Sequence, residues 1–81
     1  MVQEGKRMSE STRKQLNYTI ACIHEFARKK QMSQRDAYIY LNQYQGLSFL
    51  NDCYDIEHTL SMEDALADLE MICRKNGGTL A

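Results

Sequence analysis

Residues 54–64 read YDIEHTLSMED, and this stretch decides how the last third of the chain folds. Ser61 can cap a helix by accepting a hydrogen bond from a backbone N–H three residues later, and Asp64 stands where a capping box needs its second polar residue. Glu63 and Asp64 also place negative charge at the positive end of the helix dipole. A final helix is therefore predicted over residues 62–76. Its core stripe consists of Leu66, Leu69, Ile72 and Cys73.

The segment before this helix, residues 55–59, lacks a helical period because charged residues alternate with apolar or β-branched ones. We interpret it as an extended connector, with Ile56 directed into the protein. Upstream of it, apolar residues recur at four-residue spacing, which favours a short third helix over residues 47–54. The spaced pairs are Leu50 with Tyr54 and Phe49 with Cys53.

The first helix is predicted over residues 12–30, with Ser9 or Ser11 as its N-cap. Its apolar residues recur at intervals of three and four, as on one face of a helix. This stripe consists of Leu16, Ile20, Ile23 and Ala27, and Phe26 widens it. We expect this helix to be central to the core, with Cys22 buried at the edge of the stripe as a small hydrophobic residue.

A second helix is predicted over residues 34–45, with Ser33 as its N-cap and Asp36 as the capping-box partner. Gly46 is placed to end it in a left-handed conformation. Its core face consists of Ala37, Tyr40, Leu41 and Tyr44. Tyr38 and Ile39 lie off that face, so this helix is apolar on more than one side, and either deep burial or a partner would account for this.

The composition indicates one small all-α domain. The chain has 81 residues, no proline, four glycines and 43% hydrophobic residues, which suits packed helices better than a β fold rich in turns. We expect a compact bundle of about four helices over residues 11–77, a mobile arm over residues 1–10 and a frayed tail over residues 78–81. A domain near this size buries only about 60% of the surface of its unfolded chain, so a partner or a second copy would add to a marginal stability.

Charge is divided unevenly along the chain. The formal net charge is −1, yet residues 1–36 carry eight Lys and Arg against four Asp and Glu, whereas residues 37–81 carry two against seven. We interpret this division as complementarity within the molecule and as solvated helix faces.

Basic residues at the end of the first helix supply the alternative hypothesis, a nucleic-acid-binding regulator. Arg28, Lys29 and Lys30 favour the negative end of the helix dipole, which is a sufficient reason for their position. Together with Arg35 they would form the patch that contacts phosphates.

No catalytic or metal-binding motif is complete in the sequence. The residues that could take part in such chemistry are His24, His58, Cys22, Cys53 and Cys73. Cys53 and His58 would supply only half of a closed four-ligand zinc site, so we predict no metal, no cofactor and no enzymatic activity. The odd number of cysteines and the lack of a signal peptide predict a cytoplasmic protein. No apolar run approaches the roughly 20 residues of a membrane span, so no membrane insertion is expected.

Three segments carry a family resemblance: residues 20–27, IACIHEFA; residues 33–38, SQRDAY; and residues 54–61, YDIEHTLS. In this order they resemble a family of small bacterial proteins of unknown function, over about residues 16–75. Leu60 departs from the pattern, in which a polar residue such as glutamine is expected. The resemblance implies a compact helical domain, often encoded beside a protein that looks like an ADP-ribosyltransferase. It carries over no catalytic residue.

The leading hypothesis is a non-enzymatic protein-interaction or regulatory module, which the resemblance extends to the neutralising partner of a neighbouring toxin-like enzyme. The candidate surface consists of Tyr38, Ile39, Tyr54, Asp55, His58 and Thr59, the last four of which match the family's segment. The purely structural alternative is that His58 and Thr59 only bond the backbone before the N-cap. A homodimer without another partner is a third hypothesis.

Overall fold

The computed structural model describes residues 9–79. Over this range the chain forms five helices, which are α1 Glu10–Lys30, α2 Gln34–Gln43, α3 Gly46–Asp52, α4 Tyr54–Glu57 and α5 Met62–Lys75. All regular secondary structure in this part of the chain is helical, which confirms the prediction of an all-α bundle. Most of the predicted N-terminal arm, residues 1–8, and the end of the predicted tail, residues 80–81, lie outside the described residues.

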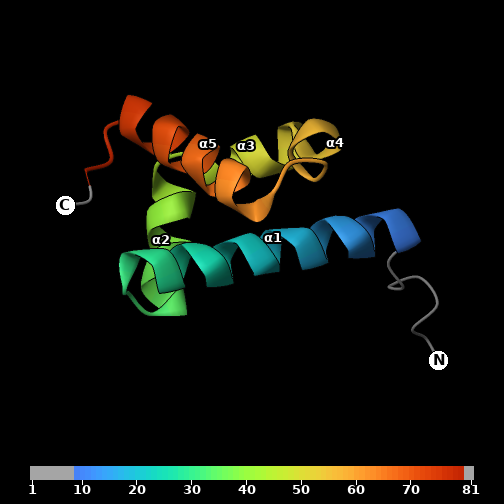
Figure 1. Cartoon of the computed structure of the whole chain (residues 1–81), viewed down its shortest axis with the longest axis horizontal. Coiled ribbons are helices and arrows are strands. Elements are labelled where there is room, and N and C mark those ends of the chain that lie inside the picture. The colour runs from blue at the N-terminus through green and yellow to red at the C-terminus, as the bar shows by residue number, and fades with distance from the viewer. Residues whose placement is uncertain (1–8, 80–81) are drawn as a thin grey trace.

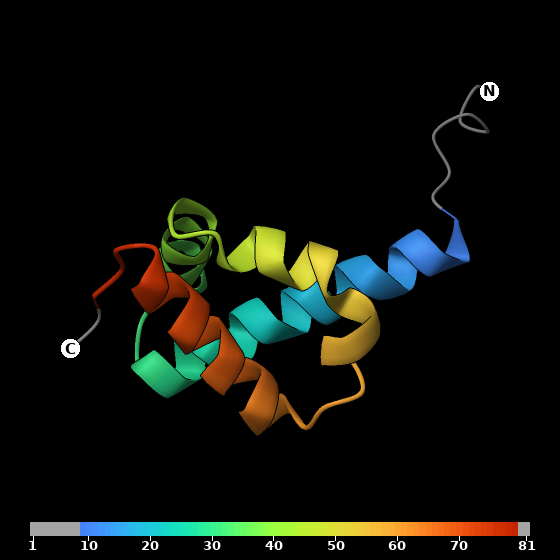
Figure 2. The ribbon, with the colours of Figure 1, turned by 90° about the horizontal axis from the view of Figure 1, so that it is seen from above.

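The long helix α1 is the element on which the others are assembled (Figure 1). α3 and α5 pack against each other and both lie across the same side of α1 (Figure 2). α2 packs against α1 and α3, close to the point where α1 ends. The short α4 continues from α3 at the other end of the bundle, so that the chain returns over α1 before α5 begins.

Serine side chains begin the three longest helices, as the sequence predicts. Each Oγ atom accepts a backbone hydrogen bond three residues on, at 3.1 Å for Ser9, 3.0 Å for Ser33 and 3.1 Å for Ser61. Ser9 is therefore the N-cap of α1 rather than Ser11. The return bonds of the predicted capping boxes, from the Asp36 and Asp64 carboxylates, do not form within residues 9–79, because aspartate is one methylene shorter than the glutamate that this motif favours.

Buried side chains from four helices form one hydrophobic core. Its members are Cys22, Phe26, Ala27, Ala37, Leu41, Leu50, Leu66, Leu69 and Cys73. Ala37 and Leu41 of the predicted α2 face are buried, and Tyr40 and Tyr44 pack against the core. Leu66, Leu69 and Cys73 of the predicted α5 face are buried, whereas Ile72 is only half-buried. The predicted burial of Cys22 is confirmed.

The predicted core stripe of α1 is wrong for two of its residues. Leu16 and Ile20 are 42% and 51% exposed. The inner face of α1 instead runs through Tyr18, Cys22 and Phe26, which are four residues apart and therefore lie above one another on the helix. A stripe centred on leucine and isoleucine lies on the wrong side of α1. Two of the three residues on the buried face are tyrosine and cysteine, which are weaker indicators of a core position.

The predicted extended connector is also wrong. Residues 54–57 form the single helical turn α4, and its backbone bonds include Glu57 N–H to the Cys53 carbonyl oxygen at 2.8 Å. Ile56, predicted to point inward, is 65% exposed, whereas Glu57 is buried. Leu50, Tyr54 and Glu57 are spaced four and three residues apart, so the inner face of α3 continues through α4 with a carboxylic acid as its last member.

Gly46 has a different role from the predicted left-handed helix end. Gln45 takes the left-handed conformation, with φ at 73°, and Gly46 is the first residue of α3. A Cβ atom at Gly46 would lie 3.0 Å from Leu41 Cδ2 and 3.1 Å from Cys73 Sγ. Glycine is therefore needed here because α3 approaches α2 and α5 closely.

A second close approach follows the end of α5. Gly77 is left-handed, with φ at 100°, and the N–H of Gly78 donates to the Cys73 carbonyl oxygen at 2.8 Å. Gly78, which the sequence analysis assigned to the tail, is buried, and a Cβ atom there would lie 2.5 Å from the Tyr40 hydroxyl oxygen. This contact joins the end of α5 to α2.

Candidate functional site

The six predicted surface residues lie in two separate places. Tyr38 and Ile39 belong to α2, whereas Tyr54 and Asp55 belong to α4 and are followed by His58 and Thr59. α2 and α4 lie at different ends of the bundle in both ribbon views (Figures 1 and 2). The structure thus brings the last four residues together and leaves the α2 pair as a surface of its own.

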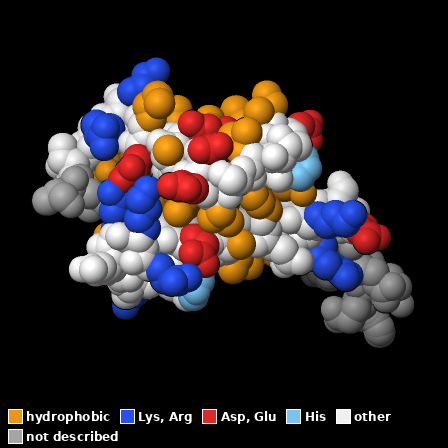
Figure 3. All heavy atoms as spheres, viewed as in Figure 1, with side chains coloured by type: hydrophobic (Ala, Val, Ile, Leu, Met, Phe, Trp, Pro, Cys, Tyr) orange, Lys and Arg blue, Asp and Glu red, His pale blue; other side chains and the backbone are white. Residues whose placement is uncertain are grey.

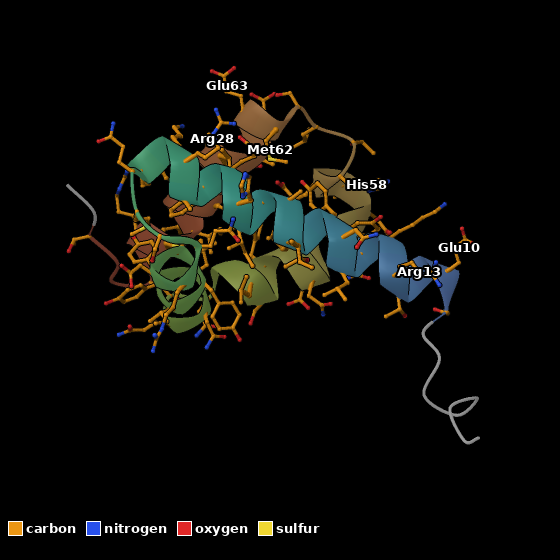
Figure 4. All side chains as sticks on the ribbon, turned by 90° about the horizontal axis from the view of Figure 1, so that it is seen from below. Glu10, Arg13, Arg28, His58, Met62 and Glu63 are labelled. Carbon is orange, nitrogen blue, oxygen red and sulfur yellow. The ribbon has the colours of Figure 1, made fainter. Side chains whose placement is uncertain are left out.

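His58 and Thr59 both bond the turn of helix that precedes them. His58 Nδ1 lies 2.7 Å from the Tyr54 carbonyl oxygen, and since a carbonyl can only accept, Nδ1 carries the proton. Thr59 Oγ1 donates to the Ile56 carbonyl oxygen at 2.7 Å. The imidazole also stacks on the Tyr54 ring, with centroids 4.4 Å apart, at the end of α4 (Figure 4). These contacts give both residues the structural role of ending α4, and Asp55 is exposed beside them.

Tyr18 attaches α4 to α1. Its hydroxyl donates to the Glu57 carbonyl oxygen at 3.0 Å, and its ring meets the Tyr54 ring edge-on at 5.6 Å. Burial is the main reason that the pKa of Tyr18 lies well above its usual range, so the hydroxyl remains a hydrogen-bond donor.

Glu57, which the sequence suggests is part of an acidic surface with Asp55, Glu63 and Asp64, is buried instead. Its side chain is only 4% exposed, and its Oε1 atom is buried without a hydrogen-bond partner among residues 9–79. The carboxyl group of Asp68 on α5 lies within hydrogen-bonding reach. Burial, reinforced by Asp68, raises the pKa of Glu57 from 4.5 to about 7. Glu57 lies at helical spacing from Tyr54 and Leu50, and this spacing is the sequence feature that could have indicated its inward position. A search restricted to apolar residues does not detect it.

The α2 surface is apolar and open. Tyr38 is 49% exposed and Ile39 is 46% exposed, although the neighbouring Ala37 and Leu41 are fully buried. Of the two explanations that the sequence left open, deep burial within this chain is therefore excluded.

The four basic residues of the nucleic-acid hypothesis do not form a uniform patch. Arg28 is 3.2 Å from a carboxylate oxygen of Glu25, and Lys30 forms an ion pair with Glu70 of α5. On the face seen in Figure 3, basic and acidic side chains alternate near the end of α1. Lys29 and Arg35 form no ion pair within the described part of the chain.

The cysteines and histidines are dispersed. Within residues 9–79 no group of three or more His, Cys, Asp and Glu side chains is arranged to hold a metal ion. Cys22 and Cys73 are core residues, and burial raises the pKa of both thiols, which keeps them in the unreactive protonated form. His24 Nδ1 lies 2.6 Å from the side-chain amide of Gln34 and links α1 to α2.

A shallow hollow of about 300 Å³ lies between α1 and α3. It is lined by Thr12, Gln15, Leu16, Thr19 and Asn51. The Gln15 amide donates to Asn51 Oδ1 at 2.8 Å across it. Since none of these side chains is ionisable, the hollow offers no general acid or base.

Within residues 9–79, none of the helices combines the length and the apolarity that are needed to cross a membrane.

Comparison with known proteins places the chain in a family. Neither a search of curated proteins nor a search of solved structures found a match. A family model described as "Protein of unknown function (DUF3791)" matches residues 17–76, a range that holds most of α1 and all the other helices. The chain therefore belongs to the DUF3791 family of proteins of unknown function.

Proposed function

We propose that this chain is a non-enzymatic, cytoplasmic module that binds another protein through α2. The observation that carries the proposal is the exposure of Tyr38 and Ile39 on a helix whose core positions are already filled by Ala37 and Leu41. Covering an apolar side chain contributes roughly 25 cal/mol for each Å² removed from water, and tyrosine is enriched in protein interfaces.

A second pair of exposed apolar residues supports the same function. Leu16 and Ile20 lie one turn apart on α1 and are each more than 40% exposed. Their spacing puts them on one edge of the helix. The chain therefore has apolar area to cover on both of its first two helices.

The basic residues support a nucleic-acid role less well. A patch that neutralises phosphates needs several uncommitted cations on one face, and two of the four candidates, Arg28 and Lys30, are already paired with glutamates.

The family resemblance suggests the partner to test first, an ADP-ribosyltransferase-like enzyme encoded nearby, with a second copy of this chain as the other partner. The tagged chain would be purified from its own bacterium with the neighbouring genes intact, and its mass measured by light scattering. A Tyr38→Ser, Ile39→Ser double variant should lose a stoichiometric partner or revert to a monomer.

The matched control is an Ile56→Ser, Met71→Ser double variant, because these residues are 65% and 54% exposed and lie on α4 and α5. It should keep the partner. A wild-type chain that is monomeric and binds no protein would refute the proposal, as would an α2 variant that behaves like the wild type. If the partner is an enzyme, adding the wild-type chain should lower its activity and adding the α2 variant should not.

A further inference from the structure

Glu57 is an acid in a place that disfavours its charge. It is the last residue of α4 and 4% exposed, and its Oε1 atom has no partner among the described residues. An ionised carboxylate would leave an unpaired charge away from water, which is among the costliest arrangements in a protein interior. A neutral carboxylic acid avoids that cost and gains an O–H group to donate.

Asp68 of α5 is the charged group that faces this carboxyl. Tyr18 and Cys22 of α1 are the other titratable groups near it, and burial raises the pKa of both, so neither carries a charge near neutral pH. Glu57 forms no ion pair with a Lys, Arg or His of residues 9–79. Two carboxyl groups can share a hydrogen bond only if one of them holds a proton, and burial of Glu57 favours protonation there.

α4 depends on such contacts for its position. It has four residues and no side-chain N-cap, and a helix of one turn is not stable by itself. The Tyr18 hydroxyl bond to the Glu57 carbonyl and the edge contact between Tyr18 and Tyr54 attach it to α1. On the other side, the Glu57 carboxyl faces that of Asp68 on α5, and these two side chains are called here the carboxyl pair.

We propose that the carboxyl pair is a pH-sensitive switch, which holds α4 against α1 and α5 while it shares a proton and releases residues 54–60 when that proton is lost to solvent. Loss of the proton leaves two negative charges facing each other at a buried position. Rotation of α4 outward hydrates Glu57 and relieves the repulsion. The same movement breaks the Tyr18 hydrogen bond and reorients Tyr54 and His58. The switch thus changes the α4 surface and does not rest on the function proposed for α2.

The test is amide hydrogen exchange followed by NMR at about pH 5 and about pH 8, each rate being divided by that of an unstructured peptide at the same pH. In the wild type, protection of the amides of residues 57–60 should fall by more than about tenfold as the pH rises from about 5 to about 8. Linkage to the raised pKa of Glu57 limits this fall to roughly 70-fold. The amides of α1 should keep their protection. In Glu57→Gln, protection of this segment should be the same at both pH values. The ¹³C signal of the Glu57 carboxyl should titrate at higher pH than is usual for a glutamate.

Two controls separate the carboxyl pair from other titrating groups. Glu63→Gln changes an exposed acid that points away from the bundle in Figure 4, and it should keep the wild-type loss of protection. His58→Gln should also keep it, because the switch does not use the imidazole, although histidine is the side chain that usually titrates in this range.

The switch is refuted if Glu57 titrates in the usual range of a glutamate, if the segment is equally protected at both pH values in the wild type, or if Glu57→Gln loses protection as the wild type does. Should the glutamine variant not fold, Asp68→Asn tests the same pair. Removing the facing charge should reduce the pH-dependent loss of protection, and an unchanged loss would overturn the proposal.

Discussion

Replacing Glu57 by glutamine should make the folded protein gain stability relative to the wild type as the pH rises from about 5 to about 8, although the side chain is buried. Burial first, and the Asp68 carboxyl second, raise the pKa of Glu57 in the folded chain from 4.5 to about 7. Between these values the folded chain holds a proton that the unfolded chain has released. The free energy of unfolding therefore decreases as the pH rises from 4.5 to about 7 and receives no further change from this group above that range.

The size of this decrease follows from the two pKa values. Each tenfold difference in proton affinity corresponds to about 1.4 kcal/mol, so Glu57 removes at most roughly 3 kcal/mol from the free energy of unfolding across this range. Glutamine carries no titratable proton, and its amide can still donate a hydrogen bond to Asp68. The difference between variant and wild type should therefore grow in favour of the variant as the pH rises.

Urea unfolding followed by far-ultraviolet circular dichroism at about pH 5 and about pH 8 measures this difference. With a slope near 1 kcal/mol per molar urea for a domain of this size, the gain of the variant relative to the wild type corresponds to a midpoint shift of up to roughly 3 M. Glu63→Gln, at an exposed position of the first turn of α5, should show no such divergence. Parallel stability curves for Glu57→Gln and the wild type would contradict the assignment of a neutral Glu57.

Four further substitutions test the packing and the helix ends, each by urea unfolding at one pH. Leu41→Ala removes part of a fully buried side chain and should lower the free energy of unfolding by about 2 to 5 kcal/mol. Gly78→Ala places a methyl group 2.5 Å from the Tyr40 hydroxyl oxygen and should cost about 1 to 3 kcal/mol, whereas a stabilised variant would show that this contact is loose. Ser9→Ala should cost about 1 kcal/mol and Ser11→Ala almost nothing, because only Ser9 caps α1; equal effects would contradict that cap.

The proposed release of α4 would also change the surface formed by Tyr54 and His58. Tyr54 and His58 are stacked on each other, and Tyr54 also contacts Tyr18 of α1. A change in the position of α4 therefore alters the shape that these rings present. In the proposed switch, protonation of Glu57 therefore affects these rings through the position of α4.

Part of the candidate site could be predicted from the sequence. The place of Tyr38 and Ile39 off the core face of α2 could be predicted, because the 3.6-residue period assigns faces within one helix. Their exposure could not, because deep burial was an open alternative until the packing of α2 was known. The segment at Tyr54, His58 and Thr59 was identified by family resemblance, yet its helical turn and its buried acid were not. Glutamate reads as a surface residue, and only contact with α1 and α5 gives it a buried position.

What the sequence by itself determined is local: the number and type of the longer helices, their starts at Ser33 and Ser61, and the inner faces of α2 and α5. Caps and periodicity act over three or four residues, so they can be read without knowing the partner helix. The tertiary structure decided which side of α1 is buried, why Gly46 must be glycine and where Glu57 lies. Each of these depends on atoms brought close from another helix, such as Leu41 and Cys73 beside Gly46, and no local pattern records that proximity.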